Sequence, residues 1–185
     1  NQAESSLAQE VNKFKPNNMD ITYLASKGII KIRYDRNSIS EEEYILFNKN
    51  LNQVFYSDII AYENIDISKI LLNLLQEKDI TVSFVESVTG GELSAKLTKN
   101  PGASSVLVGS SITYTKESKK LLIESDVKLN NWPLLAERLA DNALRQYKSD
   151  ITLSILGEAG PISSSKYGIG EIFINISNRD NSVSS

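Results

Sequence analysis

The chain of 185 residues contains no cysteine and no histidine, and it has a single tryptophan and a single methionine. Without cysteine there are no disulfides, thiolate nucleophiles or cysteine-rich metal sites. Without histidine the chain lacks the usual imidazole base and the commonest metal ligand. Catalysis by a Ser-His-Asp or Cys-His set within this chain is therefore excluded, and we expect neither a metal site nor a cofactor.

Long apolar runs and runs of one charge are also missing. No stretch approaches the roughly 20 apolar residues of a membrane span, and the chain does not open on a basic segment followed by an apolar one. Twenty basic and 23 acidic side chains give a net charge of −3, without the basic patch of a nucleic-acid binder. We therefore expect a cytoplasmic protein that binds neither membranes nor nucleic acid.

The N-terminal third shows the pattern of a small α+β unit. Residues 4–14 carry apolar side chains at helical spacing, and residues 20–34 alternate around a Ser-Lys-Gly turn, as in a hairpin. Residues 38–55 begin with a serine followed by a glutamate three positions later, the capping box of an amphipathic helix. Residues 57–61 are predicted as one more strand. The core of this unit must be small.

From residue 64 onward, predicted strands and helices alternate. This alternation is typical of a three-layer α/β/α domain with a mainly parallel sheet covered on both faces. We therefore predict an α/β fold with two domains, residues 1–63 and 64–185. The expected strands are residues 80–87, 106–114, 150–156 and 168–176, and the expected helices are residues 66–79, 90–99, 115–123 and 134–146.

The most informative motif is the sequence FVESVTGGELSAKL at residues 84–97, where a buried strand ends in a glycine-rich turn and a helix begins. Glycines allow the backbone to approach a ligand, and a helix N-terminus offers unpaired N–H groups. The turn either holds a phosphate or presents Ser87 as a nucleophile beside N–H groups that form an oxyanion site. Alternatively, Ser87 and Thr89 simply cap the helix.

Four motifs in order resemble the C-terminal domain of the CinA family. Residues 86–91 (ESVTGG) are similar to the family's ESCTGG turn, and residues 101–105 (PGASS) to its PG-SS loop. Residues 114–119 (YTKESK) match its Y-S-N-E-x-K segment, and residues 156–161 (LGEAGP) its T-G-I-A-G-P segment. The upstream residues resemble the small KH-like module that precedes this domain in CinA proteins.

The resemblance implies an amidohydrolase that converts nicotinamide mononucleotide to nicotinic acid mononucleotide without a metal. It assigns catalysis to Ser87 and Lys119, with Tyr114 orienting the lysine or the substrate; a lysine with a lowered pKa is a coherent base in a chain without histidine. Away from the family match, Lys119 would read as a solvated cation and Tyr114 as a packing aromatic. The expected substrate-binding residues are Glu86, Thr89, Gly90, Gly91, Gly157 and Gly160.

Several residues depart from the family pattern. Lys116 replaces an asparagine, Leu156 replaces a threonine, and Glu158 replaces an apolar residue and adds negative charge near the nucleotide unless it points away or pairs with Lys116. The segment before Leu135 is short and contains Trp132, so the rim of the crevice must differ. The family's last strand and C-terminal helix have no counterpart that we recognise in the sequence.

These departures leave a second function open. A non-catalytic or regulatory CinA-like module would act through protein partners in competence or DNA repair, and it would bind a nucleotide without turnover. The family analogy also implies a homo-oligomer. RNA binding by the KH-like part is disfavoured, because the basic G-x-x-G loop of such modules is missing from the sequence.

Overall fold

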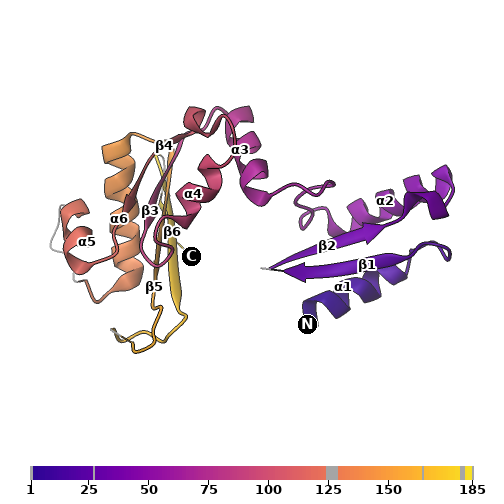
Figure 1. The fold of residues 1–185 in the computed structure, drawn as a ribbon, viewed down its shortest axis with the longest axis horizontal. Helices are drawn as coiled ribbons and strands as arrows, with labels where there is room; N and C mark the ends of the chain where they lie inside the picture. The colour runs from indigo at the N-terminus through magenta and orange to yellow at the C-terminus, as the bar shows by residue number, and fades with distance from the viewer. Residues whose placement is uncertain (1, 27, 124–128, 164, 180–181, 185) are drawn as a thin grey trace. The chain divides into compact units, whose positions relative to one another are not determined.

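A computed structural model describes residues 2–26, 28–123, 129–163, 165–179 and 182–184. It divides into two compact units, residues 1–63 and 64–185 (Figure 1). Residue 27 in the expected hairpin turn and residues 124–128 in the expected rim lie outside the described residues.

The first unit is a two-stranded hairpin with two helices and a small core. Strands β1 and β2 pair antiparallel from Ile21 opposite Tyr34 to Ser26 opposite Ile29, which confirms the hairpin. Ser40 and Glu43 form both hydrogen bonds of the capping box. The similarity of this unit to a KH-like module stays a prediction. Its elements are α1 (Gln2–Asn12), β1 (Ile21–Ser26), β2 (Ile29–Tyr34), the 3-10 turn η1 (Arg36–Ser38) and α2 (Glu41–Phe55). Its buried apolar residues are Val11, Met19, Phe47 and Leu51.

The strand expected at residues 57–61 is not formed, so this prediction is wrong. The amides of Asp58 and Ile59 both donate to the carbonyl of Phe55, at 2.8 and 3.0 Å. These bonds wrap the chain into a turn that continues from the end of α2. The apolar pair Ile59 and Ile60 therefore lies in irregular structure, although its composition is that of a strand.

The second unit confirms the predicted α/β architecture: a five-stranded sheet in the order β4-β3-β5-β6-β7. Strand β3, which lies between β4 and β5, pairs in parallel with both. Helices α3 and α4 lie on one face of the sheet, and α5 and α6 lie on the other (Figure 1). The strands are β3 (Val82–Glu86), β4 (Leu107–Ile112), β5 (Ile151–Gly157), β6 (Ile172–Asn178) and β7 (Ser182–Ser184). The helices are α3 (Ile67–Glu77), α4 (Glu92–Thr98), the 3-10 turn η2 (Ala103–Ser105), α5 (Lys116–Leu122) and α6 (Trp132–Tyr147).

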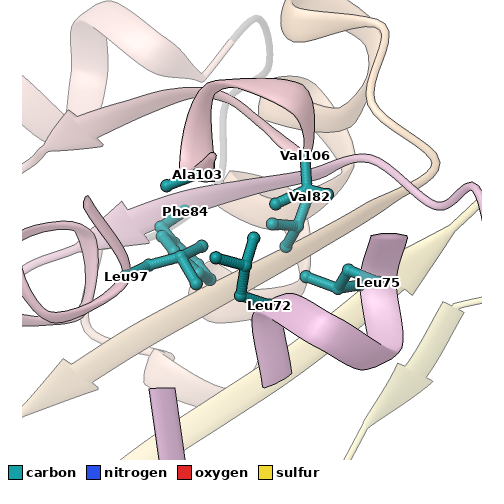
Figure 2. Packing of buried hydrophobic residues seen from close by; sticks show 7 residues of the cluster. All are labelled: Leu72, Leu75, Val82, Phe84, Leu97, Ala103 and Val106. Carbon is teal, nitrogen blue, oxygen red and sulfur yellow. The ribbon is translucent and has the colours of Figure 1, made fainter. Parts of the chain in front are cut away.

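Each face of this sheet carries its own apolar cluster. Figure 2 shows the first, in which Leu72 and Leu75 of α3 meet β3, α4 and η2. On the other face, α6 packs against Val85 of β3 and Leu156 of β5. Strand β3 is buried at all five positions, because helices cover both of its faces. The carboxyl end of β3, where Ser87 follows, is therefore held from two sides.

The far edge of the sheet corrects one expectation. Strand β6 runs antiparallel to β5, and β7 follows it and pairs antiparallel over residues 175–177 of β6. A strand thus does follow the one that we expected to be the last. Its three residues, Ser-Val-Ser, carry neither an apolar run nor enough alternation to predict a strand.

Candidate active site

Ser87 and Lys119, which are 32 residues apart in the sequence, meet at the carboxyl ends of two neighbouring parallel strands. Ser87 directly follows β3, and Lys119 lies on α5, shortly after β4. The ammonium or amine nitrogen Nζ of Lys119 lies 3.0 Å from Oγ of Ser87. Both side chains are buried, with exposed fractions of 7% for Ser87 and 9% for Lys119. Parallel α/β sheets bind ligands at this end.

Lys119 is not the solvated cation that an amphipathic helix alone would suggest. Its Nζ also lies 2.6 Å from the carbonyl of Thr113 and 3.2 Å from that of Tyr114. The ion pairs of the described residues do not include Lys119. Because burial penalises the charged form, the pKa of Lys119 is lowered from its ordinary value.

These three partners suit a neutral amine. A neutral lysine has two N–H donors and one lone pair, whereas the ammonium has three donors and none. The two carbonyls can only accept, and the Ser87 hydroxyl can donate to the lone pair. The site thus accommodates the form of lysine that can remove the serine proton.

The Gly-rich turn is organised by Glu86, whose side chain is fully buried. Its carboxylate accepts five hydrogen bonds, from the hydroxyls of Thr89 and Ser94 and from the amides of Gly91, Leu93 and Ser94. Burial is the largest influence on this carboxyl and raises its pKa, but the hydrogen bonds together outweigh it and the pKa is lowered. Glu86 therefore fills the role of helix cap.

This arrangement leaves Ser87 available for chemistry. The N-cap position of α4 is Gly91, and no side chain of that residue can cap, so Ser87 is not the cap of the helix. The amide of Ser87 donates to the carbonyl of Ile155 at 3.0 Å and is occupied. In the described part of the chain, the neighbouring amides of Val88 and Thr89 have no acceptor, so they are the nearest candidates for an oxyanion site.

Ser87 and Lys119 open into a cavity of about 650 Å³. This volume falls in the usual range of small-molecule sites. Of the residues predicted to bind substrate, Gly157 and Gly160 line the cavity. A Cβ at Gly157 would lie 3.0 Å from the Val88 side chain, so a larger residue here would have to displace Val88 by a few tenths of an ångström. The predicted contacts that do not line the cavity are Glu86, Thr89, Gly90 and Gly91, which shape the turn instead.

Tyr114 lines the cavity, and its expected role in orienting Lys119 or the substrate stays a prediction. Its side chain is 67% exposed, and its contact with Lys119 comes from the backbone carbonyl, not from the hydroxyl. Lys116, Leu156 and Glu158, the three departures from the family pattern, all line the same cavity. Sequence reasoning noted these positions and did not name them as site residues.

Trp132 lines the cavity as well, at the start of α6. Its amide donates to the hydroxyl of Tyr167 at 3.1 Å, and its ring packs against Tyr167 and Phe173 with centroids 5.2 and 5.9 Å away. In the sequence, the indication that Trp132 belongs to the site was its position in a segment that has no counterpart in the family. In the described part of the chain, no three acidic, cysteine or histidine residues are grouped as metal ligands, and no helix has the length and apolar character to cross a membrane.

A family model described as the CinA C-terminal domain matches residues 64–185. The chain belongs to the CinA family. It is 31% identical to a CinA-like protein of Prochlorococcus marinus (strain MIT 9301), over 97% of this chain and 45% of that protein. It is 32% identical to a CinA-like protein of Endomicrobium trichonymphae, over 77% of this chain and 36% of that protein. The chain thus spans less than half the length of these CinA relatives.

Solved structures of CinA superfamily proteins share the fold. A CinA superfamily protein from Enterobacter cloacae has a TM-score of 0.61 at 17% identity, covering 69% of this chain and 82% of that chain. The competence/damage inducible protein CihA from Agrobacterium tumefaciens has a TM-score of 0.56 at 23% identity, covering 62% and 73%. At these identities the likeness establishes the fold alone.

Proposed function

We propose that this CinA domain is an amidohydrolase that deamidates nicotinamide mononucleotide through a Ser-Lys mechanism. The observation that carries the proposal is the buried pair of Ser87 and Lys119, with 3.0 Å between Oγ and Nζ, facing a cavity of nucleotide size. The substrate comes from the resemblance to nicotinamide-nucleotide amidases. The cavity itself supports a small substrate that carries an amide.

The mechanism follows from this geometry. Neutral Lys119 takes the Ser87 proton as Oγ attacks the amide carbon, and the amides of Val88 and Thr89, which have no acceptor among the described residues, stabilise the oxyanion in this proposal. Lys119 then gives the proton to the departing nitrogen, the C–N bond breaks, and ammonia leaves. Water attacks the resulting ester with Lys119 again as base, which releases the carboxylic acid and restores Ser87.

The test is ammonia release from nicotinamide mononucleotide by the full chain and its variants. We expect Ser87→Ala and Lys119→Met to lower kcat by about a thousandfold or more, since each removes a group that acts in the transition state. Methionine keeps most of the lysine volume. Ser104→Ala and Lys120→Ala, which change exposed residues away from the cavity, are the matched controls and should retain activity.

A second function is favoured by one observation: Leu156 contributes an apolar side chain to the cavity wall where the family has a hydroxyl. The CinA module would then bind a nucleotide and signal to a protein partner without turnover. Nucleotide binding by the parent chain with no ammonia release would support this alternative. Self-association, also implied by the resemblance, is a further proposal that light scattering of the purified chain measures.

A further inference from the structure

The cavity holds a carboxylate that the Ser-Lys mechanism does not use. Glu158 follows β5 directly and lines the cavity together with Ser87 and Lys119, and it is only 6% exposed. Its Oε2 accepts a hydrogen bond from the Ser165 hydroxyl at 2.9 Å and a longer one of 3.5 Å from Ser163.

The backbone of Glu158 is also fixed. Its amide donates to the carbonyl of Glu171 at 3.1 Å, and its carbonyl accepts from the amide of Gly170 at 2.8 Å. The carboxylate is thus held in place before any ligand arrives. A preorganised negative charge in a largely buried wall interacts with a ligand charge more strongly than a solvated one.

Two aromatic side chains line the same cavity, Trp132 and Tyr114. Aromatic faces attract cations and stack on flat rings. An acidic side chain beside aromatic rings favours a flat cationic group and gives a neutral ring of the same shape no equivalent attraction. The exposed Lys116, also in the lining, supplies a positive charge suited to an anionic group such as phosphate.

We infer that Glu158 is a specificity-determining residue that selects substrates whose amide-bearing ring is cationic. The inference rests on the proposed function and deepens it, because it says that pyridinium carboxamides are preferred over a neutral dihydropyridine of the same shape. Glu158 and Lys116 together place opposite charges in one cavity, and the pyridinium nucleotide is a zwitterion of ring cation and phosphate anion. The negative charge of Glu158 then attracts the cationic ring.

The experiment compares binding of nicotinamide mononucleotide and its reduced, uncharged-ring form to the full chain. Ser87→Ala is present throughout, so that no turnover occurs and failure of the amidase proposal does not affect the result. Affinity is measured by calorimetry, and quenching of Trp132, the chain's single tryptophan, reports occupancy of the cavity. We expect the oxidised form to bind about tenfold more tightly or better, as expected for one charge interaction in a partly buried site.

Adding Glu158→Gln should remove this preference, by weakening the oxidised form about tenfold while changing the reduced form little. Glu158→Asp, which keeps the charge, should retain most of the preference, and it remains informative if the glutamine variant melts early. Glu77→Gln, an exposed carboxylate on α3, is the matched control and should change neither affinity. Equal binding of the two forms by the parent, equal loss of both with Glu158→Gln, or binding of neither would overturn the inference.

Discussion

At the scale of single residues, the proposed chemistry depends on a lysine whose charged form is disfavoured by burial. Burial lowers the pKa of Lys119, and its carbonyl partners leave one lone pair for Ser87. Activity should therefore require the deprotonated lysine. The pH dependence of the reaction should therefore report the pKa of Lys119.

We predict that kcat/KM for ammonia release rises with pH, with the midpoint of the rise below the ordinary lysine pKa of about 10.4. The sign follows from the base role, because the active amine gains population as pH rises through its lowered pKa. Lys119→Arg should show no such rise and almost no activity, since arginine stays protonated up to about pH 12. A profile that is flat, or that falls with pH, would exclude Lys119 as the base.

The two residues of the proposed catalytic pair could be named from the sequence, whereas the groups that support them could not. Ser87 and Lys119 occupy recognisable positions in ordered motifs. Glu86 was expected at the substrate, and its actual partners are five donors from a turn and a helix start, which no periodicity reveals. Tyr114 was expected to orient the lysine or the substrate; its contact with Lys119 comes from the backbone carbonyl, and sequence reasoning about side chains does not anticipate such contacts.

At the scale of elements, the helix that follows Ser87 is anchored by one buried carboxylate. Replacing Glu86 with glutamine should destabilise the fold by about 2–3 kcal/mol, because an amide group would face several N–H and O–H donors. Urea denaturation of the parent protein and of Glu86→Gln at pH 7 measures the difference in their free energies of unfolding. Glu92→Gln, an exposed acid in the first turn of the same helix, should cost no more than about 0.5 kcal/mol.

The difference in stability between the parent protein and Glu86→Gln should also depend on pH. Since the folded pKa of Glu86 is lowered, its contribution to stability is fully present above the unfolded value of about 4.3 and is lost as pH falls through the folded pKa. The difference between parent and Glu86→Gln should thus shrink as the pH is lowered below about 4. A difference that stays constant into acid would show that the carboxylate charge is not what stabilises the turn.

Helices and strands with a strong hydrophobic periodicity could be predicted from the sequence, but the direction of each strand in the sheet could not. Apolar spacing and N-cap residues located the helices. One of these caps is Asp66, whose side chain accepts a hydrogen bond from the Ser68 amide. Periodicity does not distinguish parallel from antiparallel strands, so the reversal at β6 could not be read from the pattern. The strand expected after α2 failed for the related reason that local composition does not show whether a partner strand is available.

At the scale of the whole molecule, the chain consists of two units with separate cores, and the candidate site lies entirely in the second. Apolar clusters cover both faces of its sheet, and about 120 residues is a common size for an independent domain. The residues that join the units are turns and irregular, mostly exposed structure. All residues that line the candidate cavity therefore belong to the second unit.

We predict that residues 64–185 alone fold cooperatively and retain ammonia release within about twofold of the 185-residue chain, as expected when few contacts cross a domain boundary. Circular dichroism during heating and the ammonia assay measure the two properties. If the shorter chain folds but loses activity, the first unit must contribute to the site. If it does not fold, the separate cores are insufficient and the division into units does not describe stability. Retained activity would assign both the fold and the chemistry to the CinA domain.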